Sequence, residues 1–255
     1  EIPTGDYYGG HRPGDNLFGE SLVAVDLDTG ERLWHFQFVH HPIWDYDVPC
    51  PPILVDITVD GRQIAAVAQP TKQGWIYVFD RVTGEPVWPI EERPVPAGNV
   101  PGEWYSPTQP FPTKPPPFAH HGVDREDIID FTPELAARAQ EIADGFVLGP
   151  IFTPPTLVSD LPGGTQGTLA LPGSWGAGNW NTGAFDPETG FYYAYSHVVP
   201  RVYRLANASD QEGTEMDYYS PNRDAPYLDG IPLVKPPWGR ITAIDLTSGE
   251  HAWQV

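Results

Sequence analysis

The stretch LVAVDLDTGERLW at residues 22–34 decides the fold, because similar stretches recur as IYVFDRVTGEPVW at 76–88 and ITAIDLTSGEHAW at 241–253. Each copy reads as a short apolar strand, an aspartate, a turn that ends in Thr/Ser-Gly-Glu, and a second strand that ends on tryptophan. A shorter copy, GAFDPETGFYY at 183–193, keeps the aspartate and the glycine but lacks the tryptophan. The sequence therefore predicts a β-hairpin at each of the four copies.

The spacing of the copies indicates the architecture. Their aspartates stand at positions 26, 80, 186 and 245, which puts 54, 106 and 59 residues between successive copies, so the middle gap is about two periods. A hairpin cannot bury its aromatic face alone, and repetition about every 50 residues is typical of four-stranded blades in a β-propeller. We predict four such units with room for a fifth; a repetitive sandwich or a β-solenoid is the alternative.

Composition supports an all-β fold and excludes several functions. The 255 residues include 31 Pro, 26 Gly, 9 Trp and 12 Tyr, which favours turns and strands over long helices. Fourteen basic and 34 acidic residues give a net charge of −20, which argues against binding to nucleic acid or to an anionic membrane surface. The single cysteine, Cys50, excludes an internal disulfide and a multi-thiolate metal site, and is expected to be a small packed residue.

Between the copies the sequence becomes irregular. Residues 91–121 are crowded with proline and predict an extended, loop-forming excursion, and a second irregular stretch covers residues 206–238. One short helix is predicted, with Thr132 as its N-cap, Pro133 at its first position and Gly145 at its end. Long loops on a repetitive scaffold are where ligand contacts tend to lie.

The densest group of chemically active side chains is HHPIWDYD at residues 40–47. In an extended chain, Asp45 and Asp47 share one face, and Trp44 and Tyr46 share the other. Paired carboxylates beside an aromatic wall could hold a hard cation or act as a base. The alternative is a loop with solvated aspartates and packed rings. The two adjacent histidines would diverge in a strand, which argues against a metal ion shared between them.

Two further segments could approach a ligand. Lys72, one of three lysines, lies in the loop PTKQG at 70–74 between two predicted strands, where a lysine is more often solvated. The run GSWGAGNW at 173–180 is rich in glycine but has neither phosphate-loop nor dinucleotide spacing. It could let the backbone approach a flat ligand with Trp175 or Trp180 against the ring, and a plain turn is the alternative.

Together these segments resemble the quinoprotein dehydrogenases, most closely the glucose dehydrogenase branch. The runs that carry the resemblance are VHHPIWDYDVP at 39–49, VDITVDG at 55–61, TKQGWIYVFDRVTGEPVWPIEERPVP at 71–96, SPTQPFPTKPPP at 106–117, GPIFTPP at 149–155 and PPWGRITAIDLTSGE at 236–250. The resemblance is collinear over nearly the whole chain. It implies an eight-bladed propeller with tryptophan-docking repeats, in which residues 1–255 form a partial domain of four to five blades with an insert-like region at about 91–150.

The resemblance also implies a chemistry. Members of the family oxidise sugar or alcohol hydroxyls by hydride transfer to pyrroloquinoline quinone, with a divalent ion, usually Ca²⁺, as Lewis acid. The first aspartate of the W-D-x-D run, here Asp45, is the catalytic base and contacts the metal. The lysine of the T-K-x-G loop, here Lys72, faces the quinone. Asn179 and Trp180 match a stretch that lines the cofactor cavity, and the electrons pass to a quinone or a cytochrome.

Location and completeness follow from the same resemblance. A periplasmic or other extracytoplasmic location is expected, although the chain begins at Glu1 and carries no signal peptide; membrane association of the complete protein stays open. The family's other metal ligands and its stacking tryptophan come from earlier blades, so we expect an internal fragment that is inactive alone. The rival function is a non-catalytic propeller scaffold for protein assembly, which has no reason to keep Asp45 and Lys72 at the family spacing.

Overall fold

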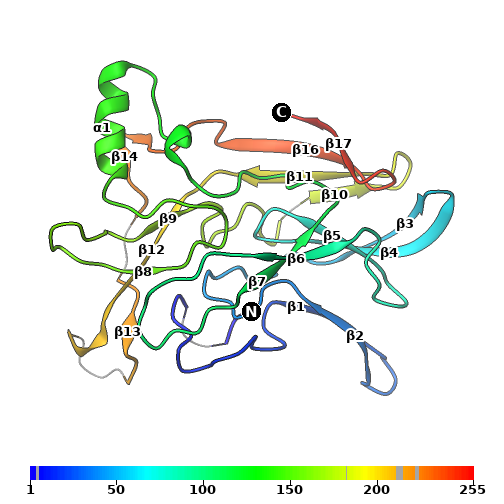
Figure 1. Cartoon of the computed structure of the whole chain (residues 1–255). Helices are drawn as coiled ribbons and strands as arrows, with labels where there is room; N and C mark the ends of the chain where they lie inside the picture. Colours follow the sequence, from blue (N-terminus) through cyan, green and yellow to red (C-terminus); the bar gives the residue numbers. More distant parts are fainter. Residues whose placement is uncertain (4–5, 182, 211–214, 222–223) are drawn as a thin grey trace.

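Strands dominate the computed structural model, which describes residues 1–3, 6–181, 183–210, 215–221 and 224–255 (Figure 1). The strands up to the helix are β1 Ser21–Val25, β2 Arg32–Gln37, β3 Ile53–Val59, β4 Arg62–Pro70, β5 Ile76–Asp80, β6 Ile90–Pro94 and β7 Thr108–Pro112. Those after it are β8 Thr156–Leu157, β9 Thr168–Ala170, β10 Gly183–Asp186, β11 Phe191–His197, β12 Arg201–Asn207, β13 Tyr218–Tyr219, β14 Tyr227–Leu228, β15 Ile231–Pro232, β16 Gly239–Asp245 and β17 Glu250–Gln254. The helix is α1, Pro133–Ala143, and two short 3₁₀ turns cover Arg125–Asp127 and Ala208–Asp210.

The four repeat copies form equivalent turns. In each, the glycine N–H donates to the carbonyl oxygen of the repeat aspartate, at 2.8–2.9 Å, in the pairs Gly30–Asp26, Gly84–Asp80, Gly190–Asp186 and Gly249–Asp245. The aspartate side chain accepts further hydrogen bonds from the turn, such as the Thr29 N–H at 2.8 Å. Since these turns place glycine at a positive φ, the repeated Asp-x-x-x-Gly spacing has a direct backbone cause.

Tryptophans connect successive repeats. The ring of Trp34 lies against Gly84 in the second copy, and the ring of Trp88 lies against Gly249 in the last copy. Each tryptophan therefore packs on the turn glycine of a following repeat, which is the arrangement that tryptophan-docking repeats predict.

The last two copies share one sheet, which corrects the predicted count of units. The sheet order is β10-β11-β16-β17, and Phe191 of β11 pairs with Asp245 of β16. The other copies lie in the hairpin β1-β2 and in the sheet β3-β4-β5. Four copies thus occupy three sheets instead of four separate units, and the copy without tryptophan is one half of a four-stranded sheet whose other hairpin carries Trp253.

The irregular regions contain more structure than the sequence predicted. Residues 91–121 include the hairpin β6-β7, because prolines are tolerated in a two-stranded sheet, where each strand keeps one unpaired edge. The predicted helix is confirmed as α1, and the Thr132 hydroxyl accepts from the Leu135 N–H at 3.2 Å. Of residues 206–238, the segments 211–214 and 222–223 lie outside the described residues. The described remainder carries short strands and the 3₁₀ turn Ala208–Asp210.

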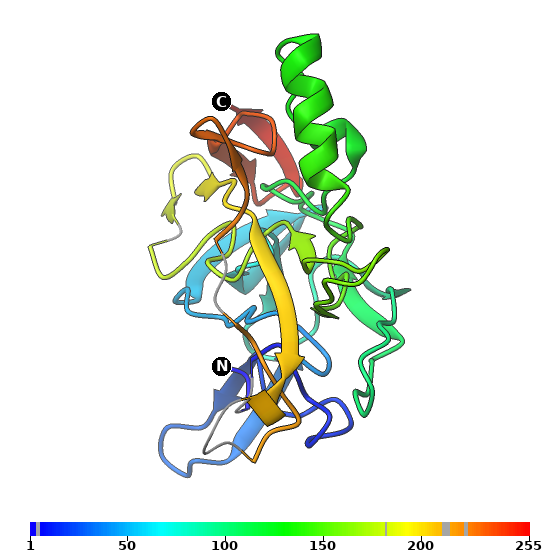
Figure 2. The same cartoon turned by 90° about the vertical axis from the view of Figure 1, so that its left-hand side faces the viewer.

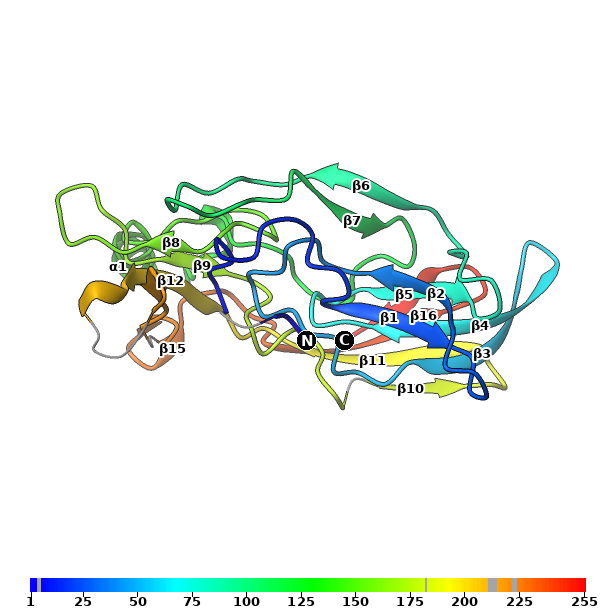
Figure 3. The ribbon, with the colours of Figure 1, turned by 90° about the horizontal axis from the view of Figure 1, so that it is seen from below.

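The strands and the helix fall into two groups at opposite ends of the molecule. The sheets of the repeat copies gather at one end, while α1, β8, β9 and β12 lie at the other (Figure 3), and α1 projects beyond the sheets (Figure 2). A buried aromatic cluster joins the two parts and includes Phe38, Trp44, Tyr46, Trp75, Tyr77, Phe79, Phe152 and Tyr203. In the described part of the chain, no helix has the length and apolar character needed to cross a membrane.

Candidate active site

The segment 40–47 lies between the sheets and holds two aspartates over the aromatic cluster. It is not a strand, and Asp45 has a left-handed backbone conformation with φ at +57°. The predicted alternation nevertheless holds for the side chains. Trp44 and Tyr46 are buried in the cluster, and Asp45 and Asp47 both turn to Lys72. The buried Trp44 ring helps to hold the segment in place, because its indole N–H donates to the Thr153 carbonyl oxygen at 3.0 Å.

Lys72 is held between the two carboxylates. Its ammonium donates to Asp45 Oδ1 at 3.0 Å, to Asp47 Oδ2 at 3.1 Å and to the Asp45 carbonyl oxygen at 2.9 Å. The residue is only 6% exposed, which excludes a solvated lysine at a hairpin tip. The tight turn after β4 places it, since the Gly74 N–H donates to the Thr71 carbonyl oxygen at 3.0 Å.

The two aspartates have different pKa values, because burial, their mutual hydrogen bond and the shared lysine act on them differently. Burial, together with a hydrogen bond to Asp47, raises the pKa of Asp45 to about 7, although Lys72 opposes this shift. Burial would also raise the pKa of Asp47, but the hydrogen bond from Asp45 and the charge of Lys72 hold it below the ordinary value. Burial acts against the ammonium of Lys72, yet its two aspartates raise the pKa of that group. The trio therefore holds one ionised carboxylate, one carboxyl poised near neutrality and one cation.

These groups open onto a cleft of about 440 Å³. It is lined by Tyr7, Asp45, Asp47, Lys72, Ser174, Trp175, Asn179 and Arg201. The structure thus brings three of the four predicted site residues together. Trp180 does not line this cleft; it is 73% exposed and borders a separate pocket with Pro51 and Tyr192. Trp175 and Tyr7 provide the aromatic side chains of the cleft.

Asn179 is fixed by its own loop. Its side-chain N–H donates to the Trp175 carbonyl oxygen at 2.9 Å, and its side-chain oxygen accepts from the Trp180 N–H at 2.8 Å. The buried thiol of Cys50 donates to the Asn179 carbonyl oxygen at 3.0 Å, which confirms a packed cysteine. The glycine-rich run is tied to the lysine loop because the Ala177 N–H donates to the Lys72 carbonyl oxygen at 2.7 Å.

Sequence reasoning missed several cleft residues. Tyr7 and Arg201 enter from segments that carry no motif, so only their place in the fold identifies them. Ser174 stands in the glycine-rich run at 173–180, but nothing in that run singles it out. Asp6 lies close enough for Asp47 to contribute, after burial, to raising the pKa of Asp6. In the described ranges, however, no group of three or more His, Cys, Asp or Glu side chains is arranged to hold a metal ion. Asp45 and Asp47 are two neighbouring carboxyl groups at the cleft.

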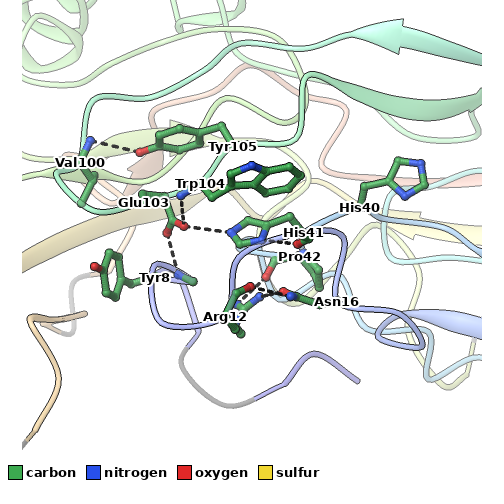
Figure 4. Close-up of polar contacts among 12 residues, drawn as sticks. Tyr8, Arg12, Asn16, His40, His41, Pro42, Val100, Glu103, Trp104 and Tyr105 are labelled. Atoms are coloured by element: carbon green, nitrogen blue, oxygen red, sulfur yellow. Dashed lines mark hydrogen bonds and ion pairs between the residues drawn. The ribbon is translucent and has the colours of Figure 1, made fainter.

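The adjacent histidines diverge, as expected for neighbouring side chains. His40 contacts Gln37 and Glu92. His41 turns to Gly14 and Glu103, and its ring points away from that of His40 (Figure 4). The two rings therefore cannot share one metal ion.

Comparison with known proteins shows the family of the chain. A family model described as "PQQ: Glucose/ethanol/alcohol dehydrogenase, beta-propeller domain" matches residues 1–255. The chain is 34% identical over 282 residues to the quinoprotein glucose dehydrogenase of Escherichia coli, covering 99% of this chain and 33% of that protein. It is 33% identical over 272 residues to the quinate/shikimate dehydrogenase (quinone) of Acinetobacter baylyi, covering 98% and 32%.

A solved structure shares the fold. The quinohemoprotein alcohol dehydrogenase from Comamonas testosteroni matches with a TM-score of 0.54 and 25% identity, covering 96% of this chain and 30% of that one. The chain spans about a third of the length of these relatives. Because the family model matches from the first residue to the last, the chain belongs to the PQQ-dependent glucose/ethanol/alcohol dehydrogenase family and forms part of its β-propeller domain.

Proposed function

We propose that the intact protein is a dehydrogenase that oxidises a sugar or alcohol hydroxyl with pyrroloquinoline quinone, and that Asp45 is its catalytic base. One observation carries the proposal: a buried lysine binds two aspartates at a cleft, and one of these aspartates has a pKa of about 7. A general base works best when its pKa lies near the operating pH. The names of the relatives, which include glucose and quinate/shikimate dehydrogenases, support a polyhydroxylated or alcohol substrate.

Asp45 would take the proton of the substrate hydroxyl. Its carboxylate lines the cleft beside Lys72 and Asn179, so a hydroxyl bound there lies within reach of an acceptor oxygen. The left-handed backbone at Asp45 is uncommon for a residue with a side chain, and such strain persists only where surrounding contacts enforce it. The carboxylate is therefore held in one place before the substrate arrives.

The cleft offers contacts to a flat, polar cofactor. Lys72 and Arg201 bring positive charges to a wall that also carries Asp45 and Asp47. Asn179 and Ser174 bring polar groups, and Trp175 brings an aromatic face. The quinone, when bound, supplies the two-electron acceptor for the reaction. Lys72 would hold an electronegative oxygen of the cofactor while keeping its contacts with Asp45. In this proposal Trp175, instead of the expected Trp180, is the tryptophan beside the cofactor.

A divalent ion, with Ca²⁺ as the proposed species, would bind at Asp45. Calcium takes six to eight oxygen ligands, so the carboxylate of Asp45 would be one of several. The remaining ligands would come from the cofactor, from water or from residues outside the described part. A cation at this position would favour the ionised form of Asp45, which is the form that accepts a proton.

The electron acceptor and the location belong to the same proposal. A quinone or a cytochrome would accept electrons from the reduced cofactor, and the protein would work in the periplasm or another extracytoplasmic space. A non-catalytic scaffold is the rival function, and no contact in the cleft favours it. A scaffold gains nothing from a buried lysine between two partly buried carboxylates, because burying charges is costly.

Substitution of Asp45 tests the proposal. In the intact protein supplied with saturating quinone and Ca²⁺, Asp45→Asn keeps the shape but removes the proton acceptor, so turnover should fall by about 10²–10⁴. Asp47→Asn is the matched control, since it touches the same ammonium but leaves the base in place; its turnover above neutral pH should stay within about tenfold of the parent protein. An Asp45→Asn protein with full turnover would remove Asp45 from the mechanism.

A further inference from the structure

The segment that carries Asp45 depends on side chains from elsewhere. It forms no regular strand, and both His41 and Asp45 have positive φ values, +45° and +57°. Gln109 clamps the backbone of His40, accepting its N–H at 2.8 Å and donating to its carbonyl oxygen at 2.7 Å. The Tyr203 hydroxyl donates to the Trp44 carbonyl oxygen at 2.8 Å. A segment with this backbone is stable only where such contacts over-determine it.

His41 of this segment forms a buried pair with Glu103. His41 Nε2 is 2.9 Å from Glu103 Oε1, and the two side chains are 0% and 1% exposed. On the other side of the ring, His41 Nδ1 is 2.8 Å from the Gly14 carbonyl oxygen. The imidazole therefore links three separate loops: that of Gly14, its own, and that of Glu103 (Figure 4).

The hydrogen bonds hold both partners on two sides. The Gly14 carbonyl oxygen can only accept, so His41 Nδ1 carries a hydrogen. Glu103 accepts the Gly9 N–H on Oε2 at 2.6 Å and the Trp104 N–H on Oε1 at 2.9 Å. His41 Nε2 and Glu103 Oε1 share the remaining contact at 2.9 Å. Both nitrogens of the ring and both oxygens of the carboxyl group are therefore hydrogen-bonded.

We propose that His41 and Glu103 form a positioning pair that holds the segment 40–47, and with it Asp45, in the geometry that the reaction requires. The inference rests on the proposed role of Asp45 as base. His41 lies four residues before Asp45, within the same irregular segment, and it is the point at which that segment is tied to the loops of Gly14 and Glu103. Displacement of a catalytic group by about 1 Å can lower a rate by about 10²-fold.

The neighbouring histidine provides an internal comparison. His40 Nε2 is 3.0 Å from Glu92 Oε1, nearly the same distance as in the buried pair, but the side chains are 22% and 51% exposed. An exposed pair contributes little, whereas removal of one partner from a buried pair leaves an uncompensated charge. Glu92→Gln is therefore a matched control for Glu103→Gln: it makes the same chemical change beside the adjacent histidine.

The first experiment tests the hydrogen bond from His41 to Gly14 without any turnover. Nitrogen NMR of the intact protein labelled at its eight histidines, with His41→Gln for assignment, should show a hydrogen on Nδ1 of His41. A His41 ring without a hydrogen on Nδ1 overturns the inference. That result would leave the assignment of Asp45 as base untouched, so the two failures are distinguishable.

The second experiment measures positioning. In the intact protein with quinone and Ca²⁺, kcat per quinone-loaded site should fall about 10- to 100-fold in Glu103→Gln, with the substrate KM and the quinone Kd within about threefold of the parent protein. Glu92→Gln should stay within about twofold for all three. A purely structural role predicts a lower melting temperature and less loaded protein, but an unchanged rate at each loaded site; that result overturns the inference.

A second variant covers the case in which Glu103→Gln does not fold. A β-carbon added at Gly9 would lie 2.6 Å from His41 Nε2 and 3.1 Å from the Arg12 guanidinium carbon. Gly9→Ala keeps every charge but presses on the buried ring, so it should also lower kcat at each loaded site by about tenfold or more. An unchanged kcat in a folded, loaded Gly9→Ala protein contradicts the positioning role.

Discussion

The indole ring of Trp34 lies directly over Gly84, so closely that a β-carbon at Gly84 would come within 2.6 Å of the ring. The indole N–H also donates to the Arg81 carbonyl oxygen at 3.2 Å, in the same turn. The last strand of one repeat is thereby fixed to the turn of the following repeat. Two features of this contact require glycine at position 84. Its backbone has a positive φ of +78°, and the ring occupies the space that a side chain would need.

We predict that Gly84→Ala destabilises the protein more than Gly30→Ala does. Gly30 occupies the equivalent turn position, has a similar φ of +72° and has no atom within 4 Å of an added β-carbon. Both variants incur the conformational strain, but only Gly84→Ala displaces a tryptophan. Overpacking costs roughly 1–3 kcal/mol, so the unfolding free energies of the two variants should differ by about that amount in urea titrations. Equal losses would show that the tryptophan contact contributes nothing.

The repeats could be predicted from the sequence because the interactions that form each turn are between residues close together in the chain. An aspartate that accepts from its own turn and a glycine at positive φ leave a fixed spacing in the chain, and Trp34 and Trp88 mark the docking contacts. Sheet membership is not local. The copy around Asp186 looks like a separate unit in the sequence, but β11 pairs with β16 across the intervening residues 198–238. No spacing rule predicts that pairing.

Lys72 should set both cofactor binding and the ionisation of Asp45. Lys72→Met keeps most of the side-chain volume but removes the ammonium that contacts both aspartates. A hydrogen bond to a charged group contributes about 1.5–3 kcal/mol, so the Kd for the quinone should rise about 10- to 100-fold in equilibrium titrations. Because Lys72 lowers the pKa of Asp45, its loss should also move the acid limb of the pH–rate profile to higher pH. Unchanged quinone binding would place Lys72 outside the cofactor site.

The candidate site was predictable where a motif names the residue. Asp45 and Lys72 stand in short runs with characteristic neighbours, and the structure brings them within 3.0 Å of each other. Glu103 and Arg201 could not be found in this way, since each reaches its partners from a segment without a motif. Trp175 and Trp180 are both plausible in the sequence, and only the path of the glycine-rich loop decides which one faces the cleft.

His121 should make the fold sensitive to acid. Burial lowers the pKa of its imidazole to about 4, where Nε2 donates to the Gln73 carbonyl oxygen at 2.7 Å and the ring packs edge-on against Trp75. The unfolded chain takes up the proton near pH 6.5 and the folded protein only near pH 4, so the stabilisation is present above pH 6.5 and is lost as the pH falls to 4. The loss amounts to about 3 kcal/mol at most. Urea unfolding at pH 7 and pH 4.5 measures it, and His121→Gln should show a smaller decrease than the parent protein; parallel decreases would exclude His121 as the source.

Asp47 should control the pH at which Asp45 becomes an effective base. Burial is the main reason that the pKa of Asp45 is raised to about 7, and the hydrogen bond and the negative charge of Asp47 raise it further. Asp47→Asn removes that negative charge, so the pKa of Asp45 should fall and its carboxylate should remain ionised at lower pH. A base must be ionised to act, and the rate falls up to about tenfold for each pH unit below its pKa. Relative to its own rate at pH 8, the Asp47→Asn protein should therefore retain several-fold more activity at pH 5.5 than the parent protein does. Steady-state rates at fixed quinone and Ca²⁺ concentrations measure this difference. Lys72→Met should shift the acid limb of the pH–rate profile in the opposite direction, to higher pH. If both variants shift the acid limb in the same direction, that limb does not reflect the ionisation of Asp45.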